Sequence, residues 1–327
     1  MYPTELPLDS LLSESAEYSS LKSDLEKIRL LSTGGWELRN YLRKFLSPRP
    51  GEEDAVYESR LEKFAYSNVL GSAIAQLSSK ITNGSVHLSL ADARLDDFWL
   101  RFREDNDGNG RTEIQLLEQV FSESLKYRTV FAHIDKPSAI VAPRNRAEEE
   151  ALGLRPKIIV YPGIQVPLYK ESDGVLQWLK VFQILDYPTP FAGSLKLARW
   201  TFIDTTYIAR YESFVKLNYD GQILELLNEN GDPLPISETP KVPRSSLVEH
   251  GFGFTPVVVL RLPMEKWGAN QAYGLAEQCL RLECHRYDLL TSAYLQRTYK
   301  PIKTPDSDLD KLRYSPVSRQ KKSELKK

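Results

Sequence analysis

The sequence predicts an α+β fold in which helices come first, strands follow, and one more long helix comes near the end. Apolar residues recur at helical spacing through most of the first 125 residues. From about residue 155, short runs of alternating apolar and polar residues are separated by turn residues, which is typical of strands. Helical spacing returns over residues 270–298 and ends at Pro301. The 327 residues show no internal repeat and suffice for one large or two ordinary domains.

The first 83 residues are predicted to be mainly helical. Residues 7–47 carry many charges and an apolar stripe at helical spacing, formed by Leu21, Leu25, Ile28 and Leu31. A glycine pair interrupts this pattern, and a second short helix is predicted over residues 36–45. We expect a single long helix over residues 53–81, followed by a short strand over residues 86–90.

The stretch EDNDGNGRTE matches the start of an EF-hand calcium loop through Asp105, Asp107, Asn109 and Gly110. The twelfth position of such a loop holds a glutamate that gives two oxygen ligands, but Leu116 stands at that position here. The chain contains no second copy of the loop, although such loops usually work in pairs. We therefore expect a turn rather than a calcium site.

The same stretch predicts the start of a helix. Thr112 and Gln115 have the spacing of a capping box, in which each side chain hydrogen-bonds to the backbone N–H of the other residue. Two glycines before them supply the backbone freedom that a tight turn needs. The turn is thus predicted to join an amphipathic helix over residues 96–103 to a second helix that ends near residue 125.

The middle of the chain is predicted to be rich in strands. The predicted strands cover residues 130–134, 157–161, 175–184, 200–204, 207–211, 214–218, 222–227 and 256–261. The three segments between residues 200 and 218 have the spacing of a β-meander, and Asp220-Gly221 is a strong hairpin signal. Polar or proline-containing connections are expected over residues 135–153 and 233–243.

Composition limits the class of protein. Apolar residues make up 41% of the chain, which is enough for a core, but no run of about 18 of them predicts a membrane-spanning helix. The N-terminus lacks the basic start and apolar stretch of a signal peptide. Cys279 and Cys284 lie on one predicted helix and are expected to be free thiols, as in a protein made in the cytoplasm.

Charge is unevenly distributed along the chain. The formal net charge is −1, yet the residues from Gln296 onward include ten lysines or arginines and only four acidic residues. A basic segment on a mildly acidic body can contact nucleic acid. It can also be a solvated tail, which is the more common role of such a segment.

The sequence contains no recognised catalytic or cofactor motif. The four histidines lack the spacing of a metal site, and the glycine motifs of phosphate-binding, dinucleotide-binding and hydrolase sites are absent. A metal-dependent nuclease would hold several carboxylates around a cleft. The acidic cluster found here flanks a turn instead, and consists of Asp96, Asp97, Glu104, Asp105 and Asp107. We therefore expect a structural or interaction protein without a cofactor or metal, rather than an enzyme.

Four segments, in order, carry a resemblance to a known family. The first is residues 51–81, where the matching positions are Gly51, Glu52, Tyr57, Arg60, Tyr66 and Asn68. The second is the turn from Asp105 to Thr112 followed by Tyr127–Asp135, in which one glycine of the family pattern is absent. The third is RPKIIVYP at residues 155–162, and the fourth is FTPVV at residues 254–258, followed by the helical segment and Pro301. In this order the chain resembles portal proteins of tailed bacteriophages, in particular those of cyanophages and prophages.

The resemblance implies a homo-oligomeric ring, usually a dodecamer, at one vertex of the capsid, through which double-stranded DNA enters and leaves. It implies contact with the major capsid protein, docking of the terminase during packaging, and docking of head–tail adaptors afterwards. The protein would then be a component of the virion, made in the host cytoplasm and without a membrane partner. A head-to-tail interface that closes makes such a ring without any active site.

The resemblance also gives roles to regions of the chain. Residues 1–155 correspond mainly to a helical wing, 156–262 to a strand-rich wing and clip region, 263–300 to a long stem-type helix, and 301–327 to a basic polar tail. The side chains expected to face DNA in the channel are Arg281, Arg286, Arg297, Lys300 and Lys303. Core packing or a salt bridge between subunits is an equal alternative for each of them. Related portals usually continue with further helices, including a crown.

Two other classes of protein stay open. One is a different virion protein, either a head–tail adaptor or a minor capsid protein, although adaptors are usually smaller. The other is a metal-dependent phage nuclease. A ring seen by negative-stain microscopy would support the portal, whereas a monomer that cleaves DNA with magnesium or manganese would support the nuclease.

Overall fold

The computed structural model describes residues 2–64, 66–83, 96–135, 144–145, 148, 154–189, 193–218, 221–228, 230–234 and 240–262. Helices and strands both contribute to it and one sheet is curled, so the predicted α+β class is confirmed. The predicted helix 270–298, the basic tail and the strand 86–90 lie outside these residues. The chain divides into two compact units, Met1–Arg29 with Ala73–Tyr273, and Leu30–Ser72 with Gly274–Lys327.

Most of the described helices are short, and three of them are longer than three turns. In the described part of the chain they are α1 (Leu8–Leu12), α2 (Ala16–Thr33), α3 (Gly35–Asn40), α4 (Leu42–Phe45), α5 (Asp54–Lys63), α6 (Val69–Thr82), α7 (Asp96–Glu104) and α8 (Glu113–Tyr127), together with the 3-10 turn η2 (Gly163–Gln165). The predicted apolar stripe of the first long helix is confirmed, because Leu25, Ile28 and Leu31 of α2 are buried. No helix within the described residues has the length and apolar character that a bilayer crossing requires.

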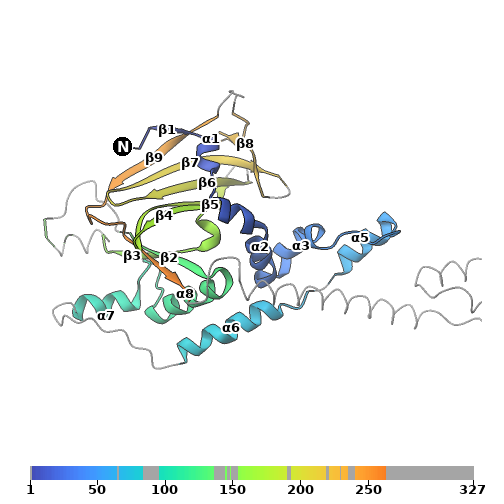
Figure 1. Cartoon of the computed structure of the whole chain (residues 1–327), viewed down its shortest axis with the longest axis horizontal. Helices are drawn as coiled ribbons and strands as arrows, with labels where there is room; N and C mark the ends of the chain where they lie inside the picture. Colours follow the sequence, from blue (N-terminus) through green and yellow to red (C-terminus); the bar gives the residue numbers. More distant parts are fainter. Residues whose placement is uncertain are drawn as a thin grey trace, which may run out of the picture. The chain divides into compact units, whose positions relative to one another are not determined.

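The strands form two antiparallel sheets in the first unit. They are β1 (Glu5–Pro7), β2 (Thr129–Asp135), β3 (Lys157–Pro162), β4 (Leu168–Ser172), β5 (Val175–Thr189), β6 (Gly193–Ile203), β7 (Tyr207–Leu217), β8 (Ile223–Leu227), β9 (Lys241–Glu249) and β10 (Val257–Arg261). The larger sheet has the order β1-β9-β7-β6-β5-β4, with β8 also paired to β7 (Figure 1). The smaller sheet has the order β10-β2-β3.

The N-terminal residues cover one face of the larger sheet. Alternation along β6 and β7 places Trp200 and Tyr211 on this face, and both are fully buried. Leu11 of α1 belongs to the same apolar cluster. Residues 2–13 form an N-terminal arm, which is fixed to the sheet by pairing of β1 with β9 and by the hydroxyl of Tyr211, which donates to the carbonyl of Pro3 at 2.7 Å. Residues from opposite ends of the described chain therefore share one core.

The smaller sheet packs against the opposite face of the larger one. Leu179 of β5 and Ile203 of β6 lie in one buried cluster with Phe131 of β2 and Tyr161 of β3. The boundary predicted near residue 155 falls between β2 and β3, which are paired in this sheet. Strands from both predicted regions thus share one sheet, while their assignment to wing and clip stays a prediction.

The single helix predicted over residues 53–81 is wrong, because the structure has two helices there, α5 and α6. Phe64 ends α5 in an extended conformation. Asn68 then starts α6 as an N-cap, since its Oδ1 accepts from the backbone N–H of Gly71 at 2.8 Å. Its Nδ2 donates to the carbonyl of Ser32 at 2.8 Å, and a Cβ at Gly71 would collide with that same carbonyl. The asparagine cap was the sequence signal for this break.

The strand prediction was incomplete in two ways. The two strands predicted over residues 207–218 are one continuous strand, β7, which pairs with β6 along most of its length. The strands β1, β4 and β9 were not predicted, and β9 begins inside the expected proline-rich connection. Pro243 of β9 lies opposite Glu5 of β1. Prolines weaken a strand pattern in sequence, yet pairing near a sheet edge tolerates them.

A buried ion pair organises the second unit. The guanidinium of Arg60 makes two parallel bonds to the carboxylate of Glu52, Nε to Oε1 at 3.0 Å and Nη2 to Oε2 at 2.8 Å. The same Nη2 donates to the carbonyl of Ser47, and the ring of Tyr57 lies 5.3 Å from the guanidinium. The hydrogen bonds from Arg60 lower the pKa of Glu52. The segment before α5 is thus fixed to the helix.

A buried lysine anchors the N-terminal arm of the first unit. The side chain of Lys180 on β5 is fully buried, and its Nζ donates to the carbonyls of Leu11 and Ser13 and to Ser13 Oγ. Three acceptors satisfy the three donors of an ammonium group. Burial lowers the pKa of Lys180 to about 8, and the charge of Glu14 opposes that shift. The lysine thereby closes the C-terminal end of α1.

Replacing Lys180 by methionine should destabilise the first unit by about 1–3 kcal/mol, because the buried carbonyls of Leu11 and Ser13 lose their donor. Urea unfolding would measure the change. Lys196→Met is the matched control, since Lys196 pairs with Asp186 at the surface and should change stability by less than about 0.5 kcal/mol. Equal stability of the two variants would show that Lys180 is no anchor.

Replacing Arg60 by methionine should cost roughly 2–4 kcal/mol of unfolding free energy, because Glu52 would stay buried without its cation. Chemical denaturation followed by circular dichroism would measure this loss. Arg43→Met is the control, because Arg43 and Glu58 form an exposed pair in the same unit. A loss in Arg43→Met as large as that in Arg60→Met would contradict the special role of the buried pair.

Candidate functional site

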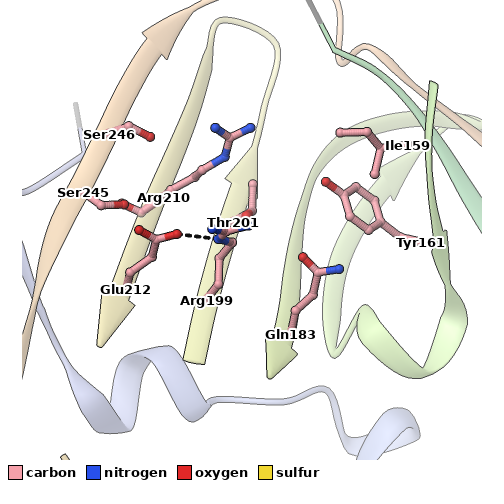
Figure 2. Close-up of a pocket in the computed structure, with 9 residues that line it drawn as sticks. All are labelled: Ile159, Tyr161, Gln183, Arg199, Thr201, Arg210, Glu212, Ser245 and Ser246. Carbon is pink, nitrogen blue, oxygen red and sulfur yellow. Dashed lines mark hydrogen bonds and ion pairs between the residues drawn. The ribbon is translucent and has the colours of Figure 1, made fainter. Parts of the chain in front are cut away.

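A polar cavity of about 450 Å³ lies in the first unit, between strands of the two sheets. Strands β5, β6, β7 and β9 of the larger sheet supply most of its lining, and β3 of the smaller sheet supplies the rest (Figure 2). The lining residues are Ile159, Tyr161, Gln183, Arg199, Thr201, Arg210, Glu212, Ser245 and Ser246. This size and concave form are typical of sites for small molecules or short segments of polypeptide.

Strand register explains why a polar cavity borders an apolar core. Residues two apart on a strand share a face. On the face toward the smaller sheet, Leu179 lies opposite Ile203 and forms an apolar row. Two residues further along the strands, Thr201 lies opposite Arg210, and Arg199 lies opposite Glu212 in the row after that. The face therefore changes from apolar to charged along the strands.

Each guanidinium in the cavity has one carboxylate partner. Arg199 donates through Nε to Glu212 Oε1 within the cavity, and the dashed line in Figure 2 marks this bond. Arg210 donates through Nη2 to Asp135 Oδ2 of β2 at 3.4 Å. The charges of these four groups balance. Within the described part of the chain, the remaining N–H groups of Arg199 and Arg210 have no protein acceptor.

Hydroxyl groups add further polar atoms to the cavity wall. Ser245 Oγ donates to the carbonyl of Arg210 at 3.2 Å. Ser246 Oγ is buried and has no hydrogen-bond partner among the described residues. Burial raises the pKa of Tyr161 to about 12, so its hydroxyl is protonated and can donate at neutral pH.

A buried histidine packs against the ring of Tyr161. His133 of β2 stacks on Tyr161 with ring centroids 6.0 Å apart and is fully buried. Neither ring nitrogen has a hydrogen-bond partner among the described residues. Burial lowers the pKa of His133 to about 4, with Asp135 opposing this shift and Arg210 adding to it. The imidazole is therefore neutral at pH 7. The donors that the cavity offers to a polar ligand are the guanidinium groups of Arg199 and Arg210 and the hydroxyl of Tyr161.

The predicted turn at residues 105–112 is confirmed as a helix joint. Thr112 and Gln115 form the capping box at the start of α8. Asp105 Oδ1 accepts from the N–H groups of Gly108 and Gly110 at 2.7 and 3.0 Å, and its Oδ2 pairs with Arg155. Burial would raise the pKa of Asp105, but the N–H groups and the charge of Arg155 lower it.

The turn also binds the strand β3. Arg111 donates through Nε to Asn106 Oδ1 at 2.8 Å and through Nη2 to the carbonyl of Ile158 at 2.5 Å. The N–H of Ile158 donates to the carbonyl of Asn106 at 2.7 Å. The turn connects α7, α8 and β3 through these bonds. In the part of the chain that is described, no three His, Cys, Asp or Glu side chains are grouped as metal ligands.

The structure and the sequence point to different functional residues. The residues expected to face DNA, Arg281, Arg286, Arg297, Lys300 and Lys303, all lie outside the described residues. The cavity residues were not predicted. Their signal in the sequence was the charged pair Arg210 and Glu212, two residues apart within one strand, and the charged Arg199 in the preceding strand. That pattern predicts a cavity only when the strand register is known, because the register determines which face of the larger sheet the smaller sheet covers.

Calcium or a chelator should leave the melting temperature unchanged, because both carboxylate oxygens of Asp105 already bond within the protein. Asp105→Ala should lower stability by about 1 kcal/mol, since the turn loses its acceptor. Differential scanning fluorimetry measures both effects. A calcium-dependent rise in melting temperature that disappears in Asp105→Ala would contradict this reading.

His133 should make the protein sensitive to acid between about pH 6.5 and 4. The folded state binds fewer protons than the unfolded state in this window, so the free energy of unfolding falls as the pH falls. His133→Phe should remove much of this loss, on the order of 2–3 kcal/mol, because no ring nitrogen has to be protonated. Urea unfolding at a series of pH values measures the difference.

Tyr161→Phe is the control for that experiment, because it changes the stacked ring while His133 stays in place. Its dependence on pH should follow that of the wild type. If His133→Phe had the same acid sensitivity as the wild type, the buried imidazole would not be its source.

Comparisons with known proteins give no family for this chain. Its sequence matches no protein-family model. A search of curated proteins found no similar sequence either.

Proposed function

We propose that this chain is the subunit of a bacteriophage portal, a ring that conducts double-stranded DNA through one vertex of the capsid. The observation that carries the proposal is the convergence of the segments that resemble portal proteins. These segments are far apart in sequence, but three of them meet in one small sheet and its adjoining turn. Such a convergence supports a shared fold rather than a set of chance matches.

The second and third segments are joined directly. Arg155, which begins RPKIIVYP, forms an ion pair with Asp105 of the turn, 50 residues earlier. The strand β3 within the third segment pairs with β2 of the second segment, with Phe131 opposite Tyr161. Residues that carry the resemblance are therefore residues that hold these elements together.

The fourth segment joins the same sheet from the other side. Its strand β10 pairs with β2, with Val257 opposite His133. The carbonyl of Pro256 accepts from the N–H of Ile134 at 2.8 Å, and Thr255 Oγ1 donates to the carbonyl of Gln177. The proline and threonine of FTPVV thus fix how β10 enters the sheet.

The first segment has a comparable role within the second unit. Four of its matching residues make the contacts that shape the backbone there: Glu52 and Arg60 form the buried pair, Tyr57 binds the carbonyl of Leu46, and Asn68 caps α6. Tyr66 donates to the carbonyl of Leu31 at 2.8 Å. The match therefore reflects positions that determine structure, which supports a common architecture.

As a portal, the protein assembles through a head-to-tail interface that closes into a ring, for which twelve subunits are usual in the family. In such a ring we expect the basic side chains Arg281, Arg286, Arg297, Lys300 and Lys303 to face the DNA in the channel. A formal net charge of −1 suits this role, because strong binding to phosphates would oppose sliding of the DNA. Terminase, head–tail adaptors and the major capsid protein are the partners in the virion, and the ring needs neither an active site nor a cofactor.

Negative-stain electron microscopy of the purified full chain, with mass photometry, tests the proposal. We expect rings with a central hole and a mass near a multiple of 37.4 kDa that corresponds to about twelve subunits. A stable monomer that cleaves DNA in the presence of magnesium or manganese would refute it and favour a nuclease. A well-folded protein that forms no ring at any concentration would favour another virion component.

A further inference from the structure

The polar cavity of the first unit offers donors that the protein itself does not use. We infer that it binds a carboxylate that carries a hydrogen-bond donor nearby, as in an amino acid or an acidic residue of a polypeptide. The inference is independent of the portal proposal, since it rests on the side chains of β3, β5, β6, β7 and β9 within one subunit.

Arg210 is the main binding group for the carboxylate. Its only acceptor among the described side chains is Asp135, at 3.4 Å, which is longer than the 2.7–2.9 Å usual for charge-assisted bonds. Arg210 lies opposite Thr201 on β6 and opposite Ser246 on β9. The guanidinium can therefore present two parallel N–H groups to a carboxylate while hydroxyls from both neighbouring strands stand beside it.

Ser246 gives an independent indication of a ligand. Its Oγ is buried at the cavity wall, and no described residue forms a hydrogen bond with it. A buried hydroxyl without a partner costs free energy, so such groups are rare unless a ligand or water completes them. The hydroxyl of Tyr161 lies in the wall on the side of β3 and is kept protonated by its raised pKa. Both hydroxyls can donate to an oxyanion at Arg210.

Glu212 determines which chemical group the ligand must carry next to its carboxylate. Its Oε1 accepts from Arg199, whereas Oε2 has no partner among the described residues. A free carboxylate oxygen is an acceptor only, so it favours an N–H or ammonium group on the ligand. The bound molecule must therefore carry an acceptor for Arg210 and a donor for Glu212, and an amino acid or a peptide unit with an acidic side chain has both.

Charge favours a carboxylate over a phosphate. The two guanidiniums are balanced by Glu212 within the cavity and by Asp135 beside it. A phosphate would bring a charge of about −1.5 to −2 close to Glu212, whereas a carboxylate brings one negative charge. The cavity volume of about 450 Å³ also admits a single amino acid or a few residues of a chain.

Saturation-transfer NMR with the full chain tests the inference, because it detects weak ligands of large assemblies. The probes are L-glutamate, the peptide acetyl-Gly-Glu-Gly-amide, its glutamine counterpart acetyl-Gly-Gln-Gly-amide, and inorganic phosphate. At least one of the two carboxylate probes should bind with a dissociation constant in about the millimolar range, and at least tenfold more tightly than the glutamine peptide. The stronger of the two carboxylate probes shows whether the natural source is a free amino acid or a polypeptide.

Three variants locate the binding. Arg210→Gln should weaken binding about tenfold or more, and Arg210→Lys should weaken it too, because lysine keeps the charge but loses the fork. Tyr161→Phe removes only a hydroxyl and gives a second reading if Arg210 variants fold poorly; it should weaken binding several-fold. Lys216→Gln is the control, since it removes one positive charge from the same strand outside the cavity, and should bind as the wild type does.

The inference fails if neither carboxylate probe binds, if the glutamine peptide binds as tightly as the glutamate peptide, or if phosphate binds better than either carboxylate. It also fails if both Arg210→Gln and Tyr161→Phe fold and keep the wild-type affinity. Ring formation is measured separately on the same samples, so loss of the ring and loss of ligand binding can be told apart.

Discussion

The antiparallel register of β5, β6 and β7 is the constraint on which the first unit depends. It places Trp200 and Tyr211 on the face that the N-terminal arm covers, and Thr201 and Arg210 on the face toward the smaller sheet. A shift of one residue would exchange these faces, burying charged groups in the apolar cluster and exposing the large aromatic rings. The two cores and the cavity thus all follow from the register in which β5, β6 and β7 pair.

The N-terminal arm stabilises this register, and ordering the arm costs chain entropy. Lys180 reaches the carbonyl of Leu11 across a separation of 169 residues, and β1 pairs with β9 over an even longer one. Contacts of this kind close large loops, and closing a loop costs chain entropy. A buried ammonium group with all three donors used offsets part of that cost and fixes where the arm ends.

Local signals in the sequence were sufficient for some elements and insufficient for others. The capping box of Thr112 is a contact between near neighbours and was predicted. The strands β2, β3 and β10 were predicted from their own apolar runs, although their partners are distant in the sequence. The strand β4 was missed although it pairs with the next strand, β5, with Ser172 opposite Val175, because its run LYKES is short and mostly polar. The strands β1 and β9 were missed because they pair with each other across most of the chain rather than through a local pattern. The cavity was missed for the same reason: Arg199 and Glu212 become neighbours only through pairing, and the sequence alone does not say which face of a strand is covered.

The residues that carry the resemblance to portals and the residues that line the cavity are largely different. Within the first unit, the resembling segments form β2, β3, β10 and the turn at Asp105, and a further segment begins at residue 51 in the second unit. The cavity is built mainly from β5, β6, β7 and β9, which the resemblance does not use. Only Ile159 and Tyr161 of β3 belong to both. The cavity therefore draws on both sheets, because β3 of the smaller sheet supplies one wall while the larger sheet supplies the charged side chains.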